Sequence, residues 1–277
     1  MNRVSSVKMR HKQTLEILIS TMNRKDLSFL KPMFPNHDLA DLKILIVNQT
    51  KSSNWLESDY ENIRVINSNE FGLSKSRNLA LQNASADIVL FADDDVVYLE
   101  NFENIILAAY QKYTSAALIS FQFLNDSGQL KKEYPAEEGF ITSTKRPLSS
   151  VEISVNLNSF RKQKIYFNEN FGLGTEFPAT EEQIFRRQIL KKGMKVAFVS
   201  KPILIHSDET SASNQGSESF IKAMSAQKFL AYGNFAYLWL LKFVFFLFRH
   251  KFITAKDILK SYQIGSKAIQ NIKKSEA

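Results

Sequence analysis

The sequence of 277 residues contains no cysteine. Disulfide bonds, thiolate metal sites and cysteine nucleophiles are therefore excluded, although the absence of cysteine does not by itself fix the compartment. The chain also lacks the pattern of a signal peptide, because residues 1–13 are basic and polar and no sufficiently long apolar stretch follows them. A cytoplasmic location is therefore the expectation.

Positive charge is concentrated at one end of the chain. The net charge is +8, yet residues 1–215 hold 26 Lys and Arg against 25 Asp and Glu, whereas residues 216–277 hold 10 against 3. Aromatic residues gather in the same C-terminal part. A segment that is both basic and aromatic is more typical of contact with a membrane surface than of a nucleic-acid groove, so no nucleic-acid partner is expected.

Short apolar runs alternate with helical patterns along most of the chain. The runs predict strands, and the patterns between them predict helices. The strands expected are residues 15–20, 42–47, 63–66, 88–91 and 116–123, an edge strand over 151–160, and two short strands over 196–199 and 203–206; the helices expected are 26–33, 74–83, roughly 99–113 and 181–192. This alternation predicts βαβ units and an α/β fold with a mostly parallel central sheet flanked by helices.

Three aspartates, Asp93-Asp94-Asp95, directly follow the expected buried strand 88–91. Ligands of parallel sheets bind beyond the carboxyl ends of the strands. If strand geometry persists, Asp93 and Asp95 point the same way, about 7 Å apart. Adjacent carboxylates repel one another, and Mg²⁺ or Mn²⁺ commonly binds one or two carboxylates together with substrate phosphates. A divalent metal site is therefore favoured over a solvated acidic loop or a helix N-cap.

The segment 71–81, followed closely by residues 91–95, resembles family 2 glycosyltransferases of the GT-A fold, of the type that builds bacterial surface polysaccharides. Members of that family pair a helix start of small residues and Arg-Asn with an Asp-x-Asp motif. The resemblance implies that Asp93 contacts the donor nucleoside, that Asp95 binds the metal and that Arg77 lies near the donor diphosphate. A guanidinium suits phosphate because it donates to two oxygens at once. The alternative for Arg77 is an exposed helix arginine.

Residues 171–185 resemble the glycine-rich acceptor loop of the same family, followed by an acidic pair that opens a helix. By this match Glu182 takes the place of the catalytic aspartate, and Glu181 precedes it. Transfer requires a carboxylate near the acceptor hydroxyl to accept its proton. Glutamate is one methylene longer than aspartate, which leaves open whether Glu181 or Glu182 is the base. Acidic residues also favour helix N-termini for purely structural reasons.

The loop after the first expected strand resembles the family's nucleotide-binding loop and supplies Thr21, Asn23 and Arg24 to the expected donor side. Asp94 is grouped with these donor-side residues, without a role of its own. Asn48 stands after the second expected strand, where many family members carry an aspartate for uracil. An amide can still read the edge of a pyrimidine, so the nucleotide remains open.

His206 ends the expected strand 203–206. The family often has a histidine at this point, which completes the metal site together with the acidic motif. Imidazole is a better ligand for Mn²⁺ than for Mg²⁺. The alternative is a histidine with a structural role only.

Residues 229–248 form an apolar stretch of twenty residues that Lys242 interrupts near its middle. The length suffices to cross a bilayer, but a central lysine makes insertion costly, by about 2.5–3.5 kcal/mol. Aromatic and basic residues together favour an interfacial helix, so contact with a membrane surface through 220–277 is expected. Packing on the catalytic domain is the alternative, and a membrane span is the least favoured.

Three regions are expected: a basic tail over 1–13, a GT-A catalytic domain over 14–215, which includes a linker from residue 207, and a helical membrane-associating extension over 216–277. The resemblance, which covers about residues 13–210, implies an inverting glycosyltransferase. It would use a nucleotide-diphosphate sugar, Mn²⁺ or Mg²⁺, and a growing or lipid-linked surface glycan as acceptor, at the inner face of the cell membrane. A nucleotidyltransferase should carry a glycine-rich phosphate loop after its first strand, which residues 20–24 do not provide. A non-catalytic, membrane-bound sugar-binding subunit remains a further alternative.

Overall fold

The computed structural model describes residues 13–51, 55–142, 148–207 and 215–276. Residues 1–12 of the expected basic tail and residues 208–214 of the expected linker lie outside the described residues.

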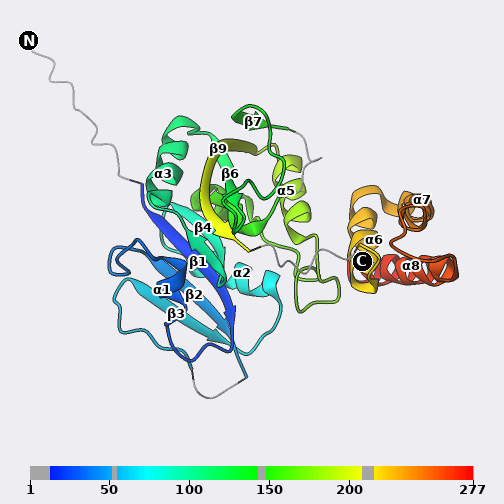
Figure 1. Cartoon of the computed structure of the whole chain (residues 1–277), viewed down its shortest axis with the longest axis horizontal. Helices are drawn as coiled ribbons and strands as arrows, with labels where there is room; N and C mark the ends of the chain where they lie inside the picture. Colours follow the sequence, from blue (N-terminus) through cyan, green and yellow to red (C-terminus); the bar gives the residue numbers. More distant parts are fainter. Residues whose placement is uncertain (1–12, 52–54, 143–147, 208–214, 277) are drawn as a thin grey trace, which may run out of the picture.

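A central sheet organises the chain up to residue 206 (Figure 1). Within the described residues it has nine strands, in the order β3-β2-β1-β4-β8-β6-β9-β5, with β7 beside β9. The strands are β1 (Leu15–Met22), β2 (Ile44–Gln49), β3 (Ile63–Ser68), β4 (Ile88–Asp93), β5 (Val96–Tyr98), β6 (Ala116–Leu124), β7 (Gly139–Ile141), β8 (Ile153–Asn156) and β9 (Lys195–His206). The four strands β3, β2, β1 and β4 are parallel, and so are β6 and β9. The prediction of a mostly parallel sheet is confirmed.

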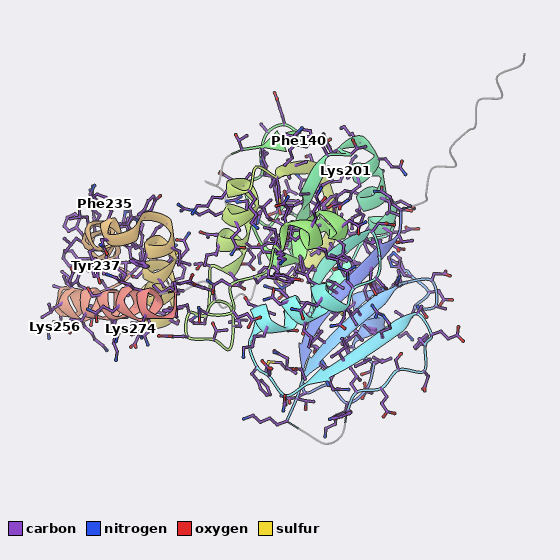
Figure 2. All side chains as sticks on the ribbon, turned by 180° about the vertical axis from the view of Figure 1, so that it is seen from behind. Phe140, Lys201, Phe235, Tyr237, Lys256 and Lys274 are labelled. Carbon is purple, nitrogen blue, oxygen red and sulfur yellow. The ribbon has the colours of Figure 1, made fainter. Side chains whose placement is uncertain are left out.

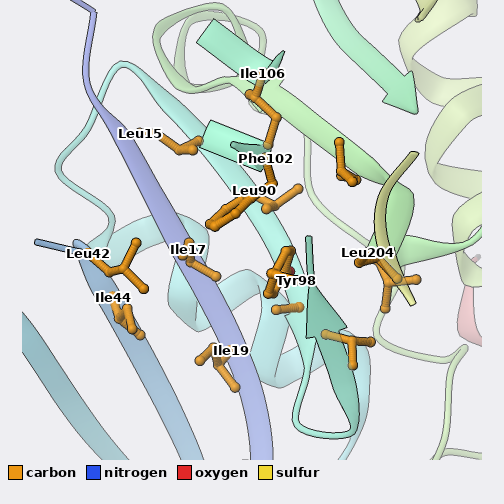
Figure 3. Packing of buried hydrophobic residues seen from close by; sticks show 14 of the residues in the cluster. Leu15, Ile17, Ile19, Leu42, Ile44, Leu90, Tyr98, Phe102, Ile106 and Leu204 are labelled. Carbon is orange, nitrogen blue, oxygen red and sulfur yellow. The ribbon is translucent and has the colours of Figure 1, made fainter. Parts of the chain in front are cut away.

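Helices cover both faces of this sheet. They are α1 (Leu30–Met33), α2 (Leu73–Asn83), α3 (Phe102–Lys112), α4 (Leu157–Gln163) and α5 (Glu181–Lys191). In β1, Ile17 and Ile19 (Figure 3) pack with α1 and α3 on one face of the sheet. Leu18 packs with α2, α4 and α5 on the other face. Successive strand residues point to opposite faces, so a strand covered on both sides needs an apolar residue at nearly every position. This double burial explains the continuous apolar runs and fixes the carboxyl ends of β1, β2 and β4 in one place.

Five expected elements differ from the structure in detail. The expected edge strand 151–160 is instead the short strand β8, which lies inside the sheet, antiparallel to β4 and β6, and is followed by α4. Asn156 ends β8 because its side chain accepts the Ser159 N–H and caps α4. The two expected short strands after residue 195 are the single strand β9, with register shifts opposite β6. The helix expected from about residue 99 begins only at Phe102, as α3, after the strand β5, which pairs with β9 and was not expected. The helix expected from residue 26 is only α1.

The last part of the chain forms three helices, α6 (Glu218–Tyr232), α7 (Ala236–Arg249) and α8 (Ile258–Ser275), which pack together beside the catalytic domain (Figure 1). The run 218–249 is, among the described residues, the one helical stretch long and apolar enough to cross a membrane by length and composition alone. It is not a single straight helix, because Gly233 has a φ of +57° and a 3₁₀ turn follows, so the expected continuous stretch 229–248 divides into two helices. Glycine adopts this backbone conformation without steric cost.

The three-helix bundle shares a core with the catalytic domain. The glycine-containing loop, residues 172–176, lies between Phe171 and Phe177. Small and aliphatic residues of α6 and α8 pack against these two phenylalanines and against Ile184 of α5. Polar contacts surround this core: the Asn271 amide donates to Glu176 at 2.6 Å, and Arg187 donates to the carbonyl of Ala231 at 2.6 Å. The alternative that the tail packs on the rest of the chain is therefore correct for α6 and α8.

Candidate active site

A cleft of about 550 Å³ opens at the carboxyl ends of β1, β2 and β4. It is lined by residues 20–24 at the end of β1, Gln49 of β2, residues 71–73 at the start of α2, the acidic residues 93–95 and residues 173–174 of the glycine-containing loop. Segments far apart in the sequence thus meet where a parallel sheet places its ligands. Of the expected site residues, six line this cleft: Thr21, Asn23, Arg24, Asp93, Asp94 and Asp95.

The rim of the cleft is held by Arg24 and Asp94. The Arg24 guanidinium donates twice to Asp94 Oδ2, at 2.9 and 2.7 Å, and the Thr21 hydroxyl donates to the same oxygen. Asn48 is fully buried next to the loop that follows β1. Its amide exchanges hydrogen bonds with the backbone of Arg24 in that loop and donates to Asn67. Asp94 thus fixes Arg24, and Asn48 fixes the loop that carries it.

The floor of the site is organised by Arg77 of α2. Its guanidinium is 2% exposed and contacts carboxylates from two distant segments: Asp93 Oδ1 at 3.1 Å, Glu181 Oε1 at 3.2 Å and Glu182 Oε1 at 3.7 Å. Burial opposes the charge, but the carboxylates outweigh it, so the pKa of Arg77 is raised. The buried Arg77 is not among the residues that line the cleft, and its expected position near the donor diphosphate stays a prediction.

Ser150, just before β8, also contacts Arg77 by accepting a hydrogen bond from Nη2. Ser150 could not be identified from the sequence, since a lone serine outside any motif carries no pattern that points to a site.

Glu181 and Glu182 open α5 beside Arg77. The Glu181 side chain is 7% exposed and accepts a hydrogen bond from Arg77, whereas Glu182 is 17% exposed and lies farther from the guanidinium. Burial and the neighbouring Glu181 raise the pKa of Glu182 to about 7, against the opposing effect of Arg77. A carboxyl group that titrates near neutrality is suited to accept a proton.

The start of α2 is hydrogen-bonded to the backbone around the glycine-containing loop. The Leu73 N–H donates to the Leu173 carbonyl at 2.9 Å, and the Ser74 hydroxyl donates to the Phe171 carbonyl at 2.6 Å. Gly172 has a φ of +103°, and a Cβ there would lie 3.1 Å from the Ser74 hydroxyl oxygen. A side chain at this position would be strained and crowded, which explains the glycine.

Asp95 and His206 approach each other at the far side of the acidic motif, with His206 Nε2 3.4 Å from Asp95 Oδ1. The strand β4 ends at Asp93, so Asp95 sits in the following turn and not on a continued strand as expected. The hydrogen bond from His206 lowers the pKa of Asp95, and the same bond raises the pKa of His206.

Within the described residues no group of three or more His, Asp or Glu side chains is arranged to hold a metal ion. A carboxylate and an imidazole fit an ion whose remaining ligands are substrate phosphates and water.

The sequence matches the family model for Glycosyl transferase family 2 over residues 16–192. No curated protein matches it in a search of curated sequences. Among solved structures, the S. aureus TarS fragment 1–349 in complex with UDP-GlcNAc has a TM-score of 0.57 and 15% identity over 93% of this chain and 80% of the fragment. A longer S. aureus TarS structure has a TM-score of 0.53 and 18% identity, and the alignment covers 84% of this chain but only 43% of that protein. The structural similarity confirms the predicted GT-A fold, and the family match covers most of the chain: this protein belongs to glycosyltransferase family 2.

Proposed function

We propose that this glycosyltransferase moves a sugar, with inversion at the anomeric carbon, from a nucleoside-diphosphate sugar to a hydroxyl group of a growing or lipid-linked surface glycan. The observation that carries the proposal is the contact of one buried cation, Arg77, with both sides of the site. Asp93 belongs to the cleft at the sheet end, and Glu182 opens α5, so a donor-side carboxylate and a candidate base are held next to each other. Transfer reactions depend on such fixed positions of the reacting groups.

The donor would occupy the cleft beyond β1 and β4. Arg24 and Asn23 line it and offer a cation and an amide to the nucleotide and diphosphate. TarS, which shares the fold, has been crystallised with UDP-GlcNAc and with UDP. A UDP-sugar is therefore the first donor to test.

Asp95 and His206 would hold Mn²⁺ or Mg²⁺, in keeping with their 3.4 Å approach. The ion would supply positive charge to the leaving diphosphate. An imidazole ligand favours Mn²⁺ over Mg²⁺.

Glu182 would act as the base. Its carboxylate accepts the proton of the acceptor hydroxyl while that oxygen bonds to the anomeric carbon and the nucleoside diphosphate leaves with the electrons of the broken bond. Glu182 is favoured over Glu181 because it is the more exposed of the two and because the hydrogen bond from Arg77 engages Glu181.

Donor hydrolysis tests the proposal. The purified protein is incubated with a panel of nucleotide sugars, with and without Mn²⁺ or Mg²⁺, and release of nucleoside diphosphate is measured. We expect metal-dependent release with one nucleotide sugar and its loss in Asp95→Ala. Asp59→Ala is the matched control, because Asp59 is exposed and lies before β3, at the ends of the parallel strands opposite the cleft.

Three outcomes would contradict the proposal. If Asp95→Ala and the control release nucleoside diphosphate equally, the metal assignment is wrong. Release of pyrophosphate from a nucleoside triphosphate and a sugar phosphate would instead indicate a nucleotidyltransferase. Donor binding without any turnover, in the presence of glycan acceptors, would indicate a sugar-binding subunit.

A further inference from the structure

Helix α7 is apolar on all sides, but the bundle covers only one of them. Its covered side consists of Ala236, Leu240, Phe243, Val244 and Leu247, which pack with α6 and α8. A helix that is hydrophobic all round is normally buried all round. The apolar residues on the other side of α7 are therefore candidates for contact with another molecule.

The uncovered side is a continuous stripe. Leu238, Leu241, Phe245 and Phe248 follow one another at helical spacing, and Phe235 precedes them in the turn before α7. Phe235 is 74% exposed, Phe245 is 62% exposed and Leu238 is 59% exposed. Figure 2 shows Phe235 at the outer edge of the bundle. We call these five residues the α7 stripe. Exposed apolar patches of this kind mark sites of protein or membrane contact.

The charges around the α7 stripe are all positive. Lys242 lies within it, and Arg249 and Lys251 follow at the end of the helix, all three exposed. No Asp or Glu occurs between Glu218 and Asp257. Basic residues beside an apolar face attract anionic lipid headgroups while their aliphatic stems remain in contact with apolar groups.

We propose that the α7 stripe docks on the surface of an anionic lipid bilayer, with α7 lying in the plane of the interface. The helix has 14 residues. Its length of about 21 Å falls short of the ~30 Å hydrocarbon core, so α7 cannot span it. The proposal concerns a surface outside the cleft and does not depend on the proposed reaction.

A second copy of this chain is the competing occupant. In a two-fold symmetric dimer centred on the α7 stripe, Lys242, near the middle of the stripe, would approach its own counterpart in an apolar interface. Like charges placed opposite each other disfavour that arrangement. The same lysine is favourable beside anionic headgroups.

Co-sedimentation of the full chain with vesicles tests the proposal. Vesicles of phosphatidylglycerol and phosphatidylcholine are compared with vesicles of phosphatidylcholine alone. We expect strong binding to the anionic vesicles, and a loss on the order of 100-fold in the partition coefficient for the double variant Phe235→Ser and Phe245→Ser. Leu130→Ser with Phe140→Ser is the matched control, because both side chains are exposed on the catalytic domain. This control should bind like the wild type.

A second variant tests the charges without altering the apolar stripe. Replacing Lys242 and Arg249 by Gln should lower the partition coefficient on anionic vesicles by roughly tenfold or more and leave binding to neutral vesicles unchanged. Raising NaCl from about 0.1 M to about 1 M should reproduce this loss in the wild type. Donor hydrolysis without vesicles, and the thermal unfolding transition, should be unchanged in both variants, which separates this proposal from the proposed reaction.

Two results would overturn the proposal. One is equal vesicle binding by the wild type and the Phe235/Phe245 variant. The other is a wild type that is dimeric by light scattering, ignores vesicles, and becomes monomeric when Phe235 and Phe245 are replaced; the α7 stripe would then be a contact between two copies of this chain.

Discussion

Two arginines lie next to the same acidic motif but differ in burial and in the carboxylates that they contact. Arg77, on the floor of the site, is 2% exposed and contacts Asp93, Glu181 and Glu182. Arg24, on the rim, is 40% exposed, and its ion pair among the described residues is with Asp94. Breaking a buried ion pair by removing one partner costs far more than breaking an exposed one, because the remaining charge is left without water. The floor arginine therefore fixes the geometry of the site, whereas the rim arginine is free to exchange its carboxylate for a ligand.

The largest expected effect is on stability and comes from the floor. Arg77→Met leaves three carboxylates without their shared cation, so the free energy of unfolding should fall by about 3–5 kcal/mol. Urea-induced unfolding measures this loss. Lys162→Met is the control, since Lys162 is exposed on α4 and its replacement should change the free energy of unfolding by no more than about 0.5 kcal/mol. If Arg77→Met were as stable as Arg24→Ala, the distinction between floor and rim would not hold.

The next effect concerns Glu182, the proposed base, which lies 3.7 Å from the floor arginine. Glu182→Gln keeps the size of the side chain but cannot accept the proton, so kcat should fall by about 10²–10⁴-fold while donor binding is retained. Steady-state kinetics with the identified donor and acceptor measure it. Glu137→Gln is the control, because Glu137 is exposed in the segment before β7, and its kcat should be unchanged. A larger loss in Glu181→Gln than in Glu182→Gln would transfer the role of base to Glu181.

The pH dependence of activity follows from the same carboxylate. Burial and Glu181 raise the pKa of Glu182 to about 7, while Arg77 opposes and Asp93 adds to the increase. The base must be ionised, so kcat/KM should fall about tenfold for each pH unit below about 7. Glu181→Gln removes a neighbouring negative charge and should move this decline to lower pH. A decline that moves to higher pH, or not at all, would show that another group controls it.

The smallest effect on stability is expected at the rim. Arg24→Ala breaks an exposed pair, so the free energy of unfolding should change by only about 0–1 kcal/mol. The Kd for the nucleotide sugar should rise by roughly tenfold, because a charged donor of hydrogen bonds is lost from the cleft. Calorimetric titration measures the binding, and Lys25→Ala, the exposed neighbouring cation, is the control. Unchanged donor affinity in Arg24→Ala would mean that the rim arginine serves only Asp94.

The first half of the catalytic domain could be predicted from the sequence because its signal is local. Strands β1 and β4 are covered on both faces, so their apolar runs are continuous. The polar residues at their carboxyl ends, Thr21 and Asp93, line the cleft where parallel sheets bind ligands. The strand β5 was missed, and β8 was expected at the edge of the sheet and too long, because each is short and depends on partners far along the chain. Strand preference depends on the neighbouring strands, which short segments do not reveal.

The contacts of Arg77 could not be predicted from the sequence for a similar reason. A guanidinium suits phosphate and carboxylate alike, and the sequence does not tell which one it meets. The answer depends on Glu181, which is 104 positions away and is brought to α2 only by folding. Contacts of this kind, between groups with several possible partners, are decided by tertiary structure.

The shared core between the bundle and the glycine-containing loop has a practical consequence for handling the protein. Phe171 and Phe177 pack on α6 and α8, and the same loop lines the cleft through Leu173 and Gly174. Cutting the chain after residue 215 would expose those phenylalanines to water and loosen the loop. A shortened protein would therefore be inactive whether or not the missing part contacts a membrane. The C-terminal bundle is thus unsuited to truncation, fusion or exchange as a detachable module, and its surface is best altered one exposed side chain at a time.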